Sequence, residues 1–156
     1  MRVGRILVPV EYSEHCRAAL RMAGDWARRL GASVEVIHVW DHPPLVPDDV
    51  TVEHTDGERR SLFELLGENA EREMNEFLAS VTLPGELSVT HHLETGEPAR
   101  AILAASEQRN ADLIVISTHG RRGFRHFLMG SVAEKIVRLS KVPVLIVPAQ
   151  IARPDP

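Results

Sequence analysis

The sequence of 156 residues predicts an α/β fold: a single domain in which helices cover both faces of an open, parallel, five-stranded sheet. The first observation behind this prediction is that strand and helix patterns alternate along the chain, as they do where right-handed βαβ units build a parallel sheet. The second is that the strand patterns are short, continuous apolar runs, which are typical of strands buried on both faces. The length suits one domain, which we place at residues 1–150, followed by a short tail at 151–156.

The composition limits the classes of function that fit. Hydrophobic residues make up 44% of the chain and charged residues 26%, as in ordinary globular proteins. A net charge of -4 argues against nonspecific binding to nucleic acid or to anionic membranes. The only cysteine, Cys16, excludes an internal disulfide and fits a reducing compartment, and no apolar run is long enough for a membrane span or a signal peptide. We therefore expect a cytoplasmic protein with neither a nucleic-acid nor a membrane partner.

The first half of the chain predicts two strands, one helix and a loop. RILVPV, at 5–10, is the first strand, and SVEVIHVW, at 33–40, is the second. Between them, Ser13 can cap the start of a helix that ends at Gly31. The apolar residues of this helix recur at helical spacing: Cys16, Ala19, Leu20, Ala23, Ala27 and Leu30. Three prolines in DHPPLVPDDV, at 41–50, predict a loop.

The second half continues the alternation of helices and strands. A long amphipathic helix follows the loop, with apolar residues spaced from Leu62 to Val81. Pro98 suits the first turn of the next helix, where its missing N–H costs nothing. The remaining predicted elements are a strand at 87–94, a helix from about Gly96 to Arg109, a strand at 112–117, a helix from Ser131 to Ser140 and a strand at 143–148.

Ligands of such sheets bind outside the carboxyl ends of the strands, where the strand order reverses. The stretch STHGRRGFRHFLMGSVAEK, at 117–135, lies at the end of the fourth strand. Its tail places Gly130 and Ser131 at the start of a helix, where free backbone N–H groups and the helix dipole attract anions. The stretch therefore predicts a phosphate site. Its basic or ionisable residues include Arg121, Arg122, Arg125 and His126.

Each of these features also has an interpretation without a ligand. Ser131 to Glu134 fits a capping box, which satisfies a helix start by itself, and the arginines could form a solvated loop. His119 could act as an acid or base beside a phosphate, although no partner nucleophile is evident. His91 and His92 are adjacent in a strand and point to opposite faces, so they do not form one metal site. We expect one of these two histidines to face inward and the other outward.

The chain resembles the universal stress protein family over nearly its whole length. ILVPVEYSE is similar to that family's first strand and turn, VEVIHVWD to its second strand, and DLIVISTHGRRGFRHFLMGSVAEKIVRLSKVPVLIVP to its C-terminal signature. The nucleotide-binding branch carries a glycine, two residues, a second glycine, nine residues, and then a glycine with a hydroxyl residue. Gly120, Gly130 and Ser131 match this motif, and Ser117 replaces its first glycine. Glu11 stands where the family usually has aspartate.

The resemblance implies the fold and the function of that branch. The implied sheet order is 3-2-1-4-5, and members commonly dimerise and bind ATP in stress responses rather than run a defined catalytic cycle. The residues implied to bind the nucleotide are Val10, Glu11, Val39, Ser117, His119, Gly120, Arg121, Gly130, Ser131 and Val132. Of these, the first three would lie near the adenosine, whereas the glycines and the start of the last helix would hold phosphates.

Three classes of function remain open. The leading hypothesis is a stress protein that binds ATP, or alternatively AMP or ADP, with Mg²⁺ accompanying ATP, and that acts on an unknown protein partner. The second is a slow ATP hydrolase or phosphotransferase that uses Glu11 or His119 in the same pocket. The third is a nucleotide-free regulatory dimer. We also expect a homodimer joined through PVLIVP at 143–148, an apolar strand at the edge of the sheet.

Overall fold

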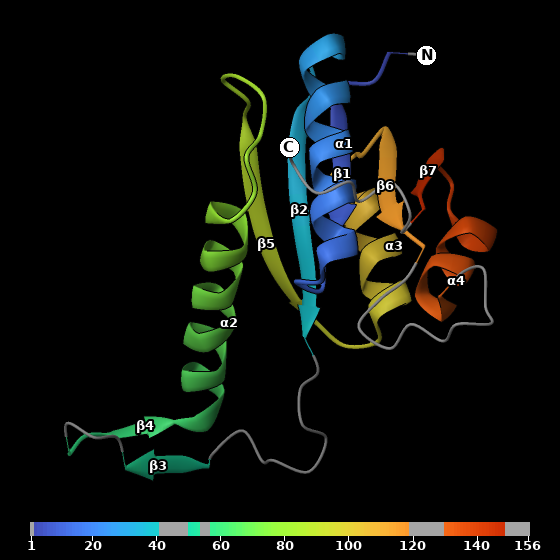
Figure 1. The fold of residues 1–156 in the computed structure, drawn as a ribbon. Helices are drawn as coiled ribbons and strands as arrows, with labels where there is room; N and C mark the ends of the chain where they lie inside the picture. Colours follow the sequence, from blue (N-terminus) through green and yellow to red (C-terminus); the bar gives the residue numbers. More distant parts are fainter. Residues whose placement is uncertain (1, 41–49, 54–56, 119–129, 149–156) are drawn as a thin grey trace.

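A computed structural model describes residues 2–40, 50–53, 57–118 and 130–148. The predicted fold class is confirmed, because five parallel strands form one sheet with helices on both faces (Figure 1). The sheet order is β5-β2-β1-β6-β7, which is the expected 3-2-1-4-5 when only the strands of this sheet are counted. These strands are β1 (Arg5–Pro9), β2 (Ser33–Trp40), β5 (Val89–Thr95), β6 (Leu113–Ser117) and β7 (Val144–Val147).

The central strand β1 is apolar on both sides, and it separates two hydrophobic cores. Ile6, Leu7 and Val8 are all 0% exposed. Ile6 and Val8 pack in the core beneath α1 and α2, whereas Leu7 packs in the core beneath α3 and α4. Two helices therefore cover each face of the sheet (Figure 1). The helices are α1 (Glu14–Leu30), α2 (Leu62–Ala79), α3 (Pro98–Gln108) and α4 (Ser131–Leu139).

Both predicted ends of α1 are confirmed. The Ser13 side chain accepts the N–H of Cys16, and Gly31 takes a left-handed conformation with φ 66° that lets the chain leave the helix. The prediction that Leu30 belongs to the buried face is wrong, since this side chain is 45% exposed. The last buried side chain of α1 is that of Ala27, about one turn earlier. The carbonyl of Ala27 accepts the N–H of Ala32, where the chain has left the helix.

A small antiparallel hairpin precedes α2 and was not predicted from the sequence. It consists of β3 (Thr51–Glu53) and β4 (Arg59–Ser61), and it lies away from the five-stranded sheet (Figure 1). Its strands are three residues long and contain no buried residue, so they lack the apolar runs by which longer strands are recognised.

Parts of two predictions fall outside the described residues. These are the proline-rich loop, apart from Val50, and the tail at 151–156. Within the part of the chain that the structure describes, no helix combines the length and the apolar character needed to cross a membrane.

Candidate functional site

Strands β1 and β6 separate toward their carboxyl ends. Their parallel ladder contains two residue pairs, both near the start of each strand. Further along, Val10 donates its N–H to the carbonyl of Ile37 in β2, at 2.8 Å. Thr118 instead donates to the carbonyl of Val147 in β7, at 3.1 Å. The strand order reverses at the same place, so the gap between these strand ends is where an open α/β sheet binds its ligand.

Glu11 lies at one side of this gap, two residues after the end of β1. Its backbone N–H donates to Sγ of Cys16 at 3.4 Å, and the residue as a whole is half-buried. Its Oε1 atom is buried and has no hydrogen-bond partner within the described residues. An unpaired buried acceptor costs about 1–3 kcal/mol, so a ligand hydroxyl that donated to it would be bound favourably. The carboxylate therefore fits a ligand with hydroxyl groups.

Gly130 brings the start of α4 against the end of β6. Its N–H donates to the carbonyl of Thr118 at 2.6 Å. A Cβ atom at this position would lie 3.2 Å from the same carbonyl oxygen, which is tighter than most real contacts. Its φ of -70° and ψ of 154° are open to any residue, so the glycine serves close approach rather than backbone freedom. A helix N-terminus thus adjoins the gap, with the positive end of its dipole toward it.

The alternative interpretation of Ser131 to Glu134 as a capping box is wrong. Gly130 is the N-cap and Ser131 is the first residue of α4, one position later than the box requires. The N–H of Glu134 bonds the carbonyl of Gly130 at 2.9 Å, and no side chain caps the helix. The Ser131 hydroxyl is consequently not used as a cap. The first N–H groups of a helix have no partner within it, so they suit an anion.

Two of the predicted apolar contacts pack against the same core, and one packs against the other. Val39, in β2, and Val132, in α4, are both half-buried against the core beneath α3 and α4. Val10 is 5% exposed and packs in the opposite core, and its N–H is bonded to the carbonyl of Ile37. Its carbonyl accepts a hydrogen bond from Nδ1 of His38 at 2.8 Å.

Ser117, which replaces the first glycine of the motif, is accommodated in the interior. It is 7% exposed, and its Oγ lies 3.7 Å from Sγ of Cys16. Cys16 itself is 2% exposed, in agreement with its prediction as an apolar helix residue. The extra side chain at Ser117 therefore packs toward α1, which carries Cys16.

The two adjacent histidines of β5 do point to opposite faces, but neither faces open solvent. Nε2 of His91 lies 2.5 Å from Oε1 of Glu71 in α2, and Nε2 of His92 lies 3.3 Å from Oε2 of Glu35. Their side chains are 25% and 26% exposed. The expectation of one inward and one outward histidine is wrong, because a helix covers each face of this strand. Within the described ranges, no group of three His, Cys, Asp or Glu side chains could hold a metal ion.

A sequence model of the universal stress protein family matches residues 2–148. The chain belongs to that family. Universal stress protein MJ0531 of Methanocaldococcus jannaschii is 33% identical over 146 residues, which cover 92% of this chain and 81% of the relative. This confirms the family resemblance seen in the sequence.

Solved structures of the universal stress protein family share the fold. That of MJ0577, from Methanocaldococcus jannaschii, has a TM-score of 0.75 at 25% identity and covers 100% of both chains. A universal stress protein in complex with cAMP has a TM-score of 0.58 at 22% identity, and one from Archaeoglobus fulgidus in complex with dAMP has 0.57 at 21%. For each of these two structures, the matched region covers 94% of this chain and 98% of the neighbour's chain.

Part of the site implied by the universal stress protein resemblance is brought together here. Glu11 and Ser117 lie at the ends of the two diverging strands, and Gly130 joins the start of α4 to one of them. His119, Gly120 and Arg121 lie outside the described residues, as does the rest of the basic stretch up to 129.

Two further residues adjoin the gap between β1 and β6 and were not predicted from the sequence as site residues. Thr118 is 8% exposed and supplies the carbonyl that Gly130 contacts. Its position next to Ser117 could have indicated it. Tyr12 follows Glu11 and has a positive φ of 65°. No sequence pattern indicates such a conformation in an aromatic residue.

Proposed function

We propose that this universal stress protein binds an adenine nucleotide, ATP in the first place and AMP or ADP as alternatives, at the gap between β1 and β6. It works in the cytoplasm as a homodimer, and the binding of nucleotide changes how the dimer acts on a protein partner. The observation that carries the proposal is the buried Oε1 of Glu11 beside the gap, which has no hydrogen-bond partner among the residues that the structure describes. Relatives of the same fold solved with cAMP and dAMP support an adenine nucleotide as the class of ligand.

Each part of the nucleotide has a matching group in the described residues. The half-buried side chains of Val39 and Val132, which pack against the same core, suit the adenine ring. The Glu11 carboxylate suits the ribose hydroxyls, which donate hydrogen bonds. The N-terminus of α4, with the Ser131 hydroxyl, suits phosphate oxygens. Mg²⁺ would then be held mainly by the phosphates of ATP, since the described residues offer no cluster of three metal ligands.

The close approach at Gly130 allows a matched test. Gly130→Ala places a Cβ 3.2 Å from the Thr118 carbonyl, and we expect it to displace the start of α4 and to weaken ATP binding. The loss of one charge-assisted hydrogen bond corresponds to about 1.5–3 kcal/mol, or roughly ten- to a hundredfold in Kd. Gly67→Ala is the control, because a Cβ there meets nothing within 4 Å. It should leave Kd unchanged.

The experiment has two parts. Acid extraction of the purified protein, followed by chromatography, identifies any nucleotide that it carries. Calorimetric titration of the nucleotide-free protein with ATP, ADP and AMP then gives the three Kd values. Absence of both a carried nucleotide and a binding signal would refute the proposal and favour a nucleotide-free dimer.

The proposed dimer joins two copies through β7. This strand is at the edge of the sheet, next to a groove of about 210 Å³. The groove is lined by Met22, Trp26, Leu145, Ile146, Val147 and Pro148. Trp26 is 42% exposed, and Leu139, on the helix that precedes β7, is 59% exposed. A second copy would pair the strand edge and cover this apolar surface.

A further inference from the structure

Tyr12 has a backbone conformation that its residue type disfavours. Its φ is 65°, in the left-handed region where a Cβ crowds the backbone. The other described non-glycine residue with positive φ is Asn110, at 52°, and asparagine tolerates this region. An aromatic residue held in this conformation indicates that the surrounding contacts determine it, and such residues concentrate at functional sites.

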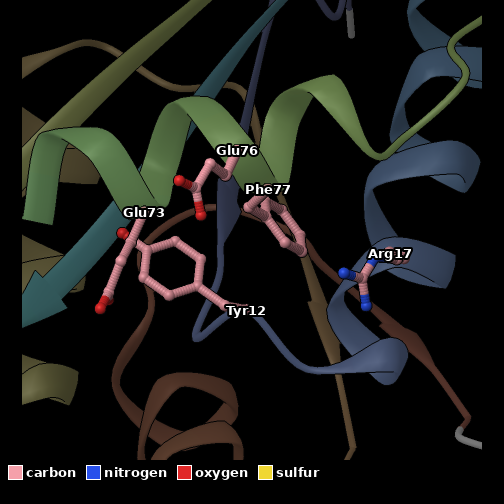
Figure 2. A pocket seen from close by; sticks show the side chains of 5 residues that line it. All are labelled: Tyr12, Arg17, Glu73, Glu76 and Phe77. Carbon is pink, nitrogen blue, oxygen red and sulfur yellow. The ribbon is translucent and has the colours of Figure 1, made fainter.

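The contacts that hold Tyr12 come from the α2 side of the sheet. Its ring stacks on the His38 ring, with centroids 4.2 Å apart and planes at 28°. It also lies 5.5 Å from the Phe77 ring, and its hydroxyl donates to the carbonyl of Ala70 at 3.4 Å. Figure 2 shows the Tyr12 ring under α2, near Phe77 and Glu73. The ring is thus enclosed by β2 and α2 except where it borders a surface cavity of about 220 Å³.

His38 also contacts Val10, the residue that precedes Glu11. Its Nδ1 lies 2.8 Å from the Val10 carbonyl, and because a carbonyl only accepts, Nδ1 must carry the proton. The same imidazole therefore bonds the residue before Glu11 and stacks on the residue after it. The N–H of Glu11 is bonded to Cys16. The backbone around Glu11 is consequently fixed at three successive residues.

We propose that Tyr12 and His38 are positioning residues that orient the Glu11 carboxylate and so set the preference of the site for ribose over deoxyribose. This inference rests on the proposed nucleotide function. Fixing the peptide groups on both sides of Glu11 fixes the direction of its Cα–Cβ bond. A carboxylate that is oriented before binding loses less freedom when it accepts the ribose hydroxyls, so its discrimination between the two sugars is larger.

The test compares Kd for ATP and for 2′-deoxy-ATP in five proteins. Tyr12→Gly accepts the positive φ without strain but removes the ring, and His38→Phe keeps a stacking ring but removes the bond to Val10. We expect the wild type to prefer ATP several-fold, and both variants to reduce this preference toward one. Tyr12→Phe, which keeps the ring, and Asn110→Gly, which changes the other positive-φ residue, should keep the wild-type preference.

Thermal unfolding of each variant without nucleotide separates positioning from general loss of structure. Tyr12→Gly should still unfold cooperatively while its preference for ATP falls. An unchanged preference in both Tyr12→Gly and His38→Phe, or equal binding of the two nucleotides by the wild type, would overturn the inference and leave the proposed function standing. A wild type that binds neither nucleotide would overturn both.

Discussion

Among the described residues, the Glu11 side chain has a buried oxygen without a hydrogen-bond donor at the place where it is proposed to bind. A buried oxygen without a donor is unfavourable in the folded protein. Residues that are poorly satisfied in the folded state recur at functional sites, where a ligand later supplies the missing partner. Substitution of Glu11 should therefore affect ligand binding far more than folding.

Glu11→Gln should weaken adenine nucleotide binding several-fold, because the amide is a weaker acceptor than the carboxylate. The preference for ribose over deoxyribose should shrink in the same variant. Glu11→Asp keeps the charge and should keep or tighten binding. Titration of the wild type and the two variants with ATP and its 2′-deoxy analogue measures these effects. Identical affinities in all three proteins would show that Glu11 does not contact the ligand.

The stability of the same variants serves as the control. Without nucleotide, the free energy of unfolding of Glu11→Gln should equal that of the wild type or exceed it by about 1 kcal/mol, since a poorly satisfied buried charge is removed. Denaturant titration measures this difference. A variant that binds less while folding at least as well has lost a ligand contact rather than its structure.

At the scale of elements, a layer of ionisable side chains joins α3 to the strands β2 and β5. The guanidinium of Arg109, at the end of α3, bonds Nε2 of His92 and Oε1 of Glu94, both at 3.1 Å. Glu35 is 2.9 Å from Arg5 on the neighbouring strand and 3.3 Å from His92. Burial lowers the pKa of His92 below 6.5, and the Arg109 charge lowers it further, against the opposing effect of Glu35 and Glu94.

This lowered pKa predicts a loss of stability in mild acid. In the unfolded chain, the pKa of His92 is near its ordinary value of 6.5. At pH values between 6.5 and the lower pKa of the folded protein, the unfolded chain therefore binds more protons than the folded protein does. The contribution of neutral His92 to the free energy of unfolding is therefore fully present above about pH 6.5. It is lost as the pH falls from 6.5 through the lower pKa of the folded protein. His92→Gln should show a smaller fall in free energy of unfolding over the same range. Urea titrations at a series of pH values measure the difference.

His91→Gln is the matched control, because His91 is adjacent in sequence but contacts Glu71 on the opposite face. The pH dependence that His92→Gln removes should persist in His91→Gln. If both variants keep the full acid sensitivity of the wild type, another group is responsible.

The starts of the helices show how far local sequence signals extend. Ser13 is an N-cap as predicted, and the structure adds Glu97, whose side chain accepts the N–H of Arg100 at 2.8 Å. The Ser-x-x-Glu spacing from Ser131 to Glu134 suggested Ser131 as the N-cap, but the N-cap is Gly130, one residue earlier. The same spacing occurs when the serine is the first helical residue, so the spacing alone does not locate the cap. The cap there is decided by the contact of Gly130 with Thr118, which joins separate elements and has no local signal.

At the scale of the whole molecule, we expect two copies joined through β7. Sedimentation at micromolar concentration should give about 35 kDa, twice the chain mass of 17.4 kDa. Leu145→Glu and Trp26→Glu each place a charge in the apolar groove beside β7 and should shift the protein toward 17.4 kDa. Phe63→Glu, at an aromatic residue of α2 that is also 42% exposed, is the control and should leave the dimer intact.

A wild-type protein that sediments as a single chain under these conditions would refute the dimer. So would a dimer that persists in both groove variants, because the interface would then lie on another surface.

The fold could be predicted from the sequence, whereas the detail of the site could not. Buried parallel strands such as RILVPV are continuous apolar runs, so their number and alternation with helices are visible in the chain itself. The order of the strands came from the family resemblance. The enclosure of Tyr12 by His38 and Phe77 depends on three separate elements, and its positive φ follows from that enclosure rather than from any neighbouring residue.

Because β1 lies in the centre of the sheet, its two neighbouring strands join it at different times during synthesis of the chain. β1 is synthesised first, yet the N–H of Gly4, just before it, is bonded to the side chain of Asp112, 108 residues further on. At ribosomal rates of about 5–20 residues per second, β1 waits roughly 4–15 s for β6 after β2 has been made. During that interval one edge of an apolar strand has no partner within the chain. The seam between β1 and β6 is therefore closed late in synthesis, and the nucleotide site proposed at that seam cannot exist before it closes.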